Sequence, residues 1–449
     1  MDELIEKIVK GEHIDLDLTN PNHLKLIKKV NSLFTPLKTV YDKMYEYYKG
    51  NTDAMANYKF VTTRSNNKVN LNYIKKFVKE EVSYSVGKEI AYESISGNDE
   101  FIKDINYELA HWKSNHNSDL MKYLLIFTEV YELYYLNKNL EFTSKLIKPT
   151  DGYAFVDSFG NILFFIHYYK NKLNNKKYMD VYTDKYIYHL DSKFNIIETP
   201  SENHFKEVPI SYGQLSEETT DDSLYKDIKG LQDASEINLS DISNEISDTR
   251  NAYLVFKNVT LDEDQATKMK EKGILILPGD RAAAEWLVKN INDTFIQNTV
   301  GTLEDKMYQI GCHINANEKM QSNTSSLALR ARLNAMENKC SLNQNAHKDI
   351  VKNRIRFLCK YLKFRKNKDY DYKDIKLKYT PNIPQDDLMM AQILSQVPEG
   401  TISLETARTQ FSFIDNAQVE GERVNKEMEA QLAKYPKDLS NMHDGEIDG

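Results

Sequence analysis

Apolar residues recur at helical spacing through much of the chain, and the clearest case lies in residues 23–50. Its apolar positions share one face: Leu24, Ile27, Val30 and Leu33 or Phe34. Gly50 follows them and is a typical helix stop. The same spacing recurs in residues 72–87, which end at Gly87. The pattern therefore predicts helices over both segments, and further helices over about 99–115 and 118–137.

Residues 141–200 have a different pattern. They are rich in Tyr, Phe, Val and Ile, they alternate between apolar and polar positions, and Gly and Asn turns interrupt them. Alternation with aromatic enrichment is typical of antiparallel strands and hairpins. Most of the tyrosines lie in the first 200 residues, and in this segment they are explained as strand formers with one polar end.

A helical hairpin with a small insert is predicted next. Helical spacing returns in residues 222–250 with a thin apolar stripe, and a second helix is expected over about 290–312. Between them, residues 252–259 and 273–278 are typical of strands, with a short helix at 262–272. The insert is therefore expected to be a small α/β unit at the tip of the hairpin.

A long helix is predicted after a polar segment. No glycine or proline interrupts residues 312–379, and apolar positions recur at spacings of three and four from Leu329 to Leu362. A helix over 326–364 would be about 58 Å long at 1.5 Å per residue. A strand is expected near residue 375 and helices over 386–433, with Asp415 and Gln418 as a capping box. The tail after Tyr435 is expected to be disordered.

Composition narrows the class of protein. The 449 residues are 41% hydrophobic and 28% charged, which is typical of a soluble globular chain, with a net charge of −8. A non-specific nucleic-acid binder would normally be basic. The three cysteines show no metal-ligand spacing, so buried or half-buried thiols in a reducing cell are expected. The N-terminus lacks the features of a signal peptide, and no window has the length of apolar sequence that spans a membrane.

No catalytic motif is found. The sequence has no GxxxxGK[ST] phosphate loop, no HExxH and no GxSxG. His313 and His347 fall in helical patterns without partners nearby in sequence and are interpreted as structural. We therefore expect a non-enzyme with no cofactor, no metal and no catalytic residue.

Four segments, taken in order, resemble one family. They are "NYIKKFVKEEVSYSVGKEI" at 72–90, "EVPISYGQ" at 207–214 with the helix after it, "SNTSSLALRARLNAMENKC" at 322–340, and "PEGTISLETARTQFSFIDNAQVEGERVNKE" at 398–427. Together they resemble the portal proteins of tailed bacteriophages, in the branch of siphophages with Gram-positive hosts. Ser326 stands where that family often has Gly, and Glu89 where it often has Pro. Ser326 is therefore expected to cap the long helix.

The resemblance implies an α+β, predominantly α portal fold. It divides the chain into a wing at 1–220, stem helices at 221–250 and 290–312, a clip at 251–289, a tunnel loop at 313–325, a long wing helix and strand at 326–385, crown helices at 386–435, and a tail at 436–449. It also implies functional residues for each part. The DNA-facing tunnel loop would contain Asn315, Asn317, Glu318, Lys319, Gln321, Ser322, Asn323 and Thr324. The channel-lining stem would contain Asp227, Asp233, Glu236, Asp241 and Glu245. The clip, which would dock an adaptor or terminase, would contain Asp262, Glu263, Lys268, Lys270, Lys272 and Trp286.

The implied function is a ring, usually of twelve subunits, at one capsid vertex. Double-stranded DNA would pass through it without tight binding. The implied partners are the large terminase subunit, a head–tail adaptor, and the major capsid and scaffold proteins; no membrane is involved. The ring would be assembled in the host cytoplasm and located in the virion. Two alternatives stay open: another head–tail connector or assembly adaptor, and a DNA-processing enzyme.

The charge of the first stem segment fits such a channel. Residues 221–250 hold eight acids against three bases, a net charge of −5. An acidic wall would repel phosphates and let DNA slide, with screening over about 8 Å at physiological salt. Lys319 would be the one cation of the loop, and either a phosphate contact or an ion pair between subunits is expected for it. The thin apolar stripe is expected to be covered by neighbouring subunits.

Overall fold

The computed structural model describes most of the chain. The described residues are 2–59, 65–218, 220–249, 253–258, 264, 267, 281, 283–287, 293–315, 326–381, 387–398, 400–411, 413–414 and 417–432. They fall into two compact units, and each is described by itself. Unit 1 comprises residues 1–85 and 91–378, and unit 2 comprises 86–90 and 379–449.

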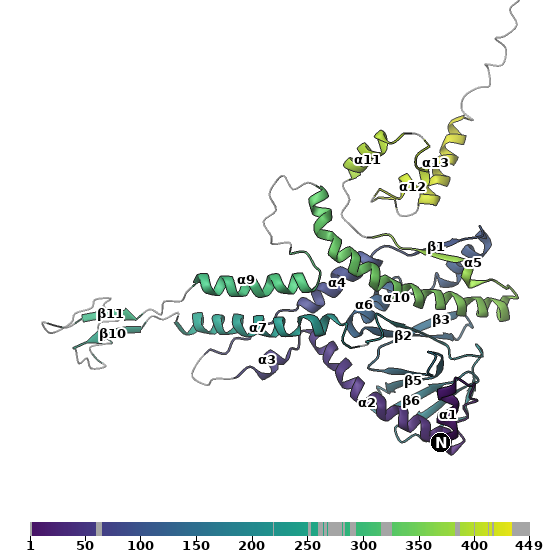
Figure 1. The fold of residues 1–449 in the computed structure, drawn as a ribbon, viewed down its shortest axis with the longest axis horizontal. Coiled ribbons are helices and arrows are strands. Elements are labelled where there is room, and N and C mark those ends of the chain that lie inside the picture. Colours follow the sequence, from purple (N-terminus) through teal and green to yellow (C-terminus); the bar gives the residue numbers. More distant parts are fainter. Residues whose placement is uncertain are drawn as a thin grey trace, which may run out of the picture. The chain divides into compact units, whose positions relative to one another are not determined.

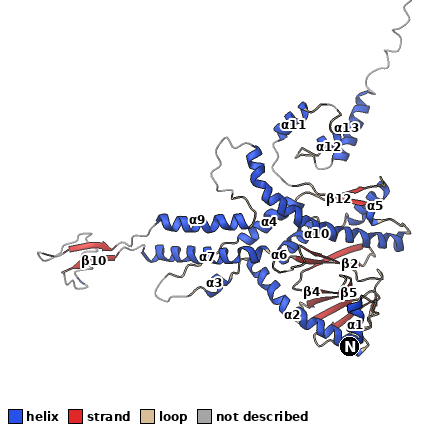
Figure 2. Ribbon diagram, in the orientation of Figure 1, coloured by secondary structure: helices blue, strands red, loops and turns tan. Residues whose placement is uncertain are grey.

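Two antiparallel sheets form the centre of unit 1 (Figure 2). The first has the order β3-β2-β9, from Phe142–Ile147, Glu129–Leu136 and Ile210–Gln214. The second has the order β4-β5-β6-β7-β8, from Gly152–Val156, Ile162–Lys170, Lys177–Tyr182, Tyr186–Asp191 and Ser201–Glu202. The strands expected over 141–200 are therefore confirmed, because aromatic and β-branched residues fill their buried faces.

The N-terminal helices cover the five-stranded sheet. They are α1 (Asp2–Lys10) and α2 (Pro21–Lys49), and Leu26 and Ile27 of α2 share a core with Phe164 and Val181 of the sheet. Gly50 ends α2 with a φ of 90°, as its position predicted.

The helix expected over 118–137 is half wrong. Helix α6 (His116–Phe127) ends at Thr128, which has a φ of 65°, and β2 begins at Glu129. The first six residues of β2 are all buried because β2 is the central strand of its sheet. Both faces of such a strand are buried, which removes the alternation of apolar and polar residues that identifies strands. The helix expected over 99–115 is shorter, since α5 covers Asp99–Leu109.

The long helix is confirmed as α10, Ser326–Lys366, a helix of 41 residues (Figure 1). Its second half packs on the three-stranded sheet, and Ile355, Leu358 and Leu362 lie in the core there. Gly213 of β9 permits this approach, because a Cβ at that position would lie 2.2 Å from Ile350 Cδ1. Strand β12 (Ile375–Lys378) follows and pairs with β1 (Ala91–Ser94), as expected near residue 375.

Two long helices lie side by side in unit 1, α7 (Leu224–Thr249) and α9 (Asp293–Ile310) (Figure 1). Between them in the chain, β10 (Tyr253–Lys257) pairs antiparallel with β11 (Ala283–Leu287). Strand β11 was not predicted, because "AAEWL" consists mainly of helix formers and pairing with β10 overrides that preference. The strand and the helix expected at 273–278 and 262–272 lie largely or wholly outside the described residues.

The remaining elements are short. Helix α3 (Asp53–Asn57) follows α2, and α4 (Tyr73–Val86) matches the helix expected over 72–87. Unit 2 contains three helices expected from the sequence, α11 (Asp387–Gln396), α12 (Leu404–Arg408) and α13 (Ala417–Leu432). The cap residue Asp415 and the tail lie outside the described residues.

Candidate functional site: helix α7 and its strap

One ridge of α7 is buried along the whole helix. Its members are spaced four residues apart: Leu224, Ile228, Gln232, Glu236, Ser240 and Asn244, all with less than 10% of their surface exposed. Residues at this spacing lie above one another on a helix surface. The ridge is apolar near the sheets and polar from Gln232 outward, so two different kinds of partner cover it.

The polar part of the ridge holds an extended segment, residues 65–71, which we call the strap. Every second backbone N–H of the strap donates to a side-chain oxygen of α7. The four bonds are Ser65 N to Asp248 Oδ1 (2.8 Å), Asn67 N to Asn244 Oδ1 (2.6 Å), Val69 N to Ser240 Oγ (2.9 Å) and Leu71 N to Glu236 Oε1 (2.9 Å). The two segments therefore run antiparallel, with side chains of α7 in the place of a neighbouring strand.

The two periodicities match in length. Two residues of extended chain rise about 6.6 Å, and four residues of α-helix rise about 6.0 Å. A straight helix can therefore offer one side-chain acceptor to each of the four inward N–H groups of the strap. This requirement explains why polar residues occupy a buried ridge. The strap covers this polar ridge and not the thin apolar stripe, in which Ile246 is 57% exposed, so the cover of that stripe by neighbouring subunits stays a prediction.

Two of the five predicted channel acids, Glu236 and Asp233, are bound by other groups of the same protomer. Glu236 is fully buried and accepts hydrogen bonds from the Thr52 hydroxyl and the Leu71 N–H. Asp233 accepts from the Tyr47 hydroxyl at 2.8 Å and pairs with Lys229 at 2.7 Å. The expectation that Glu236 lines a channel is therefore wrong, and Asp233 is already neutralised inside the protomer.

The other three predicted acids lie on the opposite side of α7. At 100° per residue, Asp227, Asp241 and Glu245 fall within roughly 40° of one another and about 140–180° from Glu236. Asp227 and Asp241 are exposed, and the Asp241 carboxylate accepts a hydrogen bond from the Tyr58 hydroxyl. We call these three positions the outward face of α7; Asp241 is at its edge, only about 20° around the helix from the strap acceptor Asp248.

A second cluster fixes the end of α9 to α4 and α10. Its centre is Glu81, a buried carboxylate that lies 3.2 Å from His313 Nε2, 2.7 Å from Lys339 Nζ and 3.0 Å from Asn343 Nδ2. Although burial opposes it, these partners hold the pKa of Glu81 below its usual range. Hence His313, the first residue of the expected tunnel loop, is attached through Glu81 to α10, the helix that follows the loop.

His313 itself is held on three sides. Its Nδ1 lies 2.8 Å from Glu80 Oε2, and its ring stacks on Phe77 at 4.1 Å. The backbone before it closes α9, with the N–H of His313 bonded to the Tyr308 carbonyl and Cys312 at a φ of 59°. The structural interpretation of His313 fits this position. Buried His347 likewise donates from Nε2 to the Asn117 carbonyl, at 3.3 Å.

Most other predicted site residues lie outside the described part of the chain. Of the predicted DNA-facing residues of the tunnel loop, only Asn315 is described. The clip residues Asp262, Glu263, Lys268, Lys270 and Lys272 lie outside it, and so do the side chains of Trp286 and Ser326. Helix α10 does begin at Ser326, but the expected cap is a claim about a side chain that is not described.

Most cations at the basic end of α10 are paired within the chain. Buried Arg354 binds Glu132 of β2 at 3.0 Å, Arg356 and Lys360 share Glu207, and Lys366 binds Glu108. Lys352 and Arg365 are exposed and have no ion-pair partner among the described residues. Most of the positive charge at this end of the helix therefore serves contacts within unit 1.

The described residues show no sign of other site types. None of their His, Cys, Asp and Glu side chains gather in threes around a possible metal position. None of the described helices combines the length and apolar character of a membrane span. Cys340 and Cys359 are buried free thiols and Cys312 is half-buried, as the sequence predicted.

Comparison with known proteins identifies the family. The family model described as "Phage portal protein, SPP1 Gp6-like" matches residues 30–434. The chain therefore belongs to the SPP1 Gp6-like family of phage portal proteins. It is a structural component of the phage capsid and not an enzyme.

Similar solved structures come from gene transfer agents. One is described as "Neck of empty GTA particle computed with C6 symmetry"; it is 11% identical, covers 75% of this chain and 87% of its own, and has a TM-score of 0.42. Another, "Virion of native gene transfer agent (GTA) particle", is 11% identical, covers 82% and 92%, and has a TM-score of 0.45. No curated protein sequence matched significantly.

Proposed function

We propose that this chain forms the portal ring at one vertex of a tailed-phage capsid, in the branch of siphophages with Gram-positive hosts. Genomic DNA passes through the ring during packaging and ejection. The family match over residues 30–434 carries the proposal. The division into wing, stem, clip, tunnel loop and crown is part of it, with α7 and α9 as the stem.

The acidic face of α7 supports a channel wall at the stem. Asp227 and Glu245 lie on the side of the helix that the strap does not cover, and Asp241 lies at the edge of that side. Repeated around a ring, this face makes a negative wall that does not grip phosphates, so DNA slides past it. The pairing of most cations at the end of α10 agrees with DNA that passes through without tight binding.

The remaining contacts follow from the same proposal. The clip docks the large terminase subunit during packaging and a head–tail adaptor afterwards. The wing contacts the major capsid and scaffold proteins, and the ring, usually of twelve subunits, assembles in the host cytoplasm. The tunnel loop meets DNA with short polar side chains, and its base is fixed by the Glu81 cluster.

The first test is the shape of the purified protein. Negative-stain electron microscopy is expected to show rings with a central hole, and light scattering a mass many times that of the 52.3 kDa chain. A strict monomer at high concentration would contradict the proposal.

The second test addresses the channel wall. Replacing Asp227, Asp241 and Glu245 with Lys reverses the outward face, so DNA packaging in vitro is expected to slow or stall while rings still assemble. The matched control carries the same three charge reversals at exposed positions away from the stem, Glu6, Glu12 and Asp349. Equal packaging by both variants would show that the outward face of α7 does not meet DNA.

A further inference from the structure

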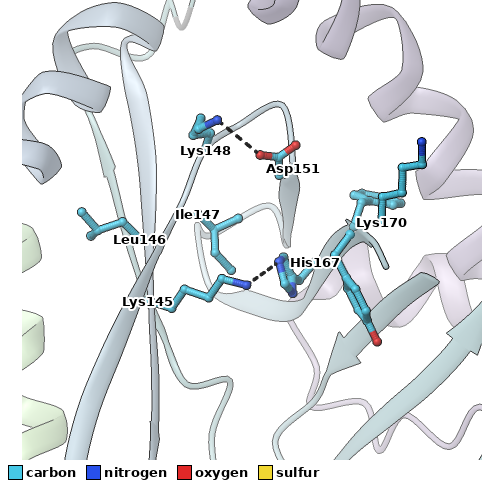
Figure 3. A pocket seen from close by; sticks show the side chains of 9 residues that line it. Lys145, Leu146, Ile147, Lys148, Asp151, His167 and Lys170 are labelled. Carbon is cyan, nitrogen blue, oxygen red and sulfur yellow. Dashed lines mark hydrogen bonds and ion pairs between the residues drawn. The ribbon is translucent and has the colours of Figure 1, made fainter. Parts of the chain in front are cut away.

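A small pocket lies between the two sheets, where β3 leads into β4 beside β5 (Figure 3). Its volume is about 250 Å³. The lining residues are Lys145, Leu146, Ile147, Lys148, Asp151, His167, Tyr168, Tyr169 and Lys170. We call it the Lys145 pocket, and it is separate from the stem and from every residue that the portal function uses above.

The charges around the pocket do not balance. Three lysines line it against one carboxylate, Asp151, which lies 3.8 Å from Lys148 Nζ. Among the described residues, neither Lys145 nor Lys170 has a carboxylate within ion-pair distance. On a chain whose net charge is −8, this leaves a local positive surplus facing a cavity.

Lys145 is the central cation. Its ammonium donates to His167 Nε2 at 3.2 Å, and Figure 3 shows the two side chains facing one another. In this contact the ammonium is the donor and His167 Nε2 the acceptor, because a lysine ammonium has no acceptor atom. Partial burial of the ammonium lowers the pKa of Lys145, and the carboxylates of Asp180 and Asp151 only partly offset this effect.

The carboxylate behind His167 is already engaged by other groups. Asp180 accepts from His189 Nδ1 at 2.8 Å and from the Tyr169 hydroxyl at 3.1 Å, and its other oxygen lies 3.9 Å from His167 Nδ1. His167, Asp180 and His189 occupy one row across β5, β6 and β7. The His167 ring therefore lies between the Lys145 ammonium and the Asp180 carboxylate, and its Nδ1 makes no hydrogen bond to a described residue.

A glycine makes the arrangement possible. Gly152 of β4 is the register partner of His167, and a Cβ there would lie 2.7 Å from both Ile147 Cγ2 and Phe165 Cζ. A larger residue would push the end of β3 away from β5. The close approach of Lys145 and His167 therefore depends on a backbone position that excludes side chains.

From this geometry we propose that the Lys145 pocket binds a phosphate group or a similar multiply charged oxyanion. Lys145 and Lys148 donate charge-assisted hydrogen bonds to it, and Lys170 adds charge at the rim. The cavity suits a compact anion. The phosphate group comes either from free phosphate or from a nucleic-acid backbone, which share this chemistry.

The test measures binding of two probes to the full chain by isothermal titration calorimetry, inorganic phosphate and a short thymidine oligonucleotide. Ionic strength is held constant with sodium chloride. Lys145→Gln is expected to weaken binding about tenfold, because one charge-assisted hydrogen bond is lost. The control Lys172→Gln removes an exposed charge from the β5–β6 turn and is expected to change binding less than about twofold.

Each outcome has a defined meaning. Binding of phosphate that depends on Lys145 assigns the pocket to a free anion, and binding of the oligonucleotide alone, with the same dependence, assigns it to a nucleic-acid backbone. No binding of either probe, or equal effects of Lys145→Gln and Lys172→Gln, overturns the proposal. Thermal unfolding of both variants in chloride alone verifies that they remain folded.

Discussion

Two buried glutamates are stabilised by different kinds of partner: Glu132 lies between the three-stranded sheet and α10, and Glu236 lies on α7. Glu132 and Glu236 both have no exposed surface. Glu132 binds the Arg354 guanidinium and His116, whereas Glu236 accepts from a hydroxyl and a backbone N–H. Although burial opposes it, Arg354 and His116 hold the pKa of Glu132 at about 2, while burial raises the pKa of Glu236.

The difference shows what each contact is suited for. The ion pair joins α10 to β2 with a charge on each side, so removing one partner leaves an uncompensated charge. The strap is held by several uncharged donors, so its binding is spread along α7. The ion pair thus attaches α10 to β2 at one strong point. The strap is attached to α7 by several weaker bonds, which we call a graded attachment.

The largest expected effect follows from breaking the ion pair. Arg354→Met is expected to lower the free energy of unfolding by roughly 3–5 kcal/mol, because Glu132 stays buried without its cation. Urea unfolding followed by circular dichroism measures the loss. Arg356→Met is the matched control: its partner Glu207 is partly exposed, and a loss of about 1 kcal/mol or less is expected. Equal losses would contradict the special role of Arg354.

A smaller loss is expected at the stem. Glu236→Ala leaves the Leu71 N–H and the Thr52 hydroxyl without their acceptor and is expected to cost roughly 1–3 kcal/mol in the same assay. Asp227→Ala, on the outward face, is expected to change stability by about 0.5 kcal/mol or less. If both variants lose the same amount, Glu236 does not hold the strap.

The two glutamates are also expected to differ in the sign of their pH dependence. The pKa of Glu132 is lower in the folded chain, so its contribution is present above the unfolded pKa of about 4.3 and is lost as the pH falls toward 2. The pKa of Glu236 is raised, so the folded chain gains protons first and Glu236 becomes less unfavourable as the pH falls from 7 toward 4.3.

Unfolding of Glu132→Gln and Glu236→Gln at pH 7, 4.3 and 2.5 separates these signs. Relative to Glu236→Gln, the wild type is expected to gain stability between pH 7 and 4.3. Relative to Glu132→Gln, it is expected to lose stability between pH 4.3 and 2.5. Parallel pH profiles for all three proteins would show that neither carboxylate has a shifted pKa.

Much of the fold was predictable from local patterns, and the site was not. Helix α10, the hairpins of the second sheet and the stop at Gly50 follow from periodicity and turn residues. Strand β2 was missed because its burial on both sides removes alternation, and β11 because pairing outweighed helix preference. The strap was missed because "NNKVNL" is an ordinary polar loop until its N–H groups meet acceptors more than 160 residues away.

One signal for the strap was present in the sequence. Gln232, Glu236, Ser240 and Asn244 continue the i+4 row of Leu224 and Ile228. A polar continuation of an apolar ridge indicates that a polar partner, such as an extended backbone, covers the row. Counting charges alone placed Glu236 with the channel acids, whereas its position on the helix places it opposite them.

The smallest expected effect tests a single step of the strap. Ser240→Ala removes the acceptor of the Val69 N–H, and the resulting loss of about 1 kcal/mol is partly offset by the better helix propensity of Ala, by a few tenths. Ser243→Ala makes the same change on α7 at a half-exposed serine whose side chain has no hydrogen-bond partner among the described residues, so it retains only the gain. The difference between the two variants in urea unfolding isolates one strap bond. Equal stability would mean that the strap does not depend on its individual bonds, and the graded attachment inferred for the stem would be wrong.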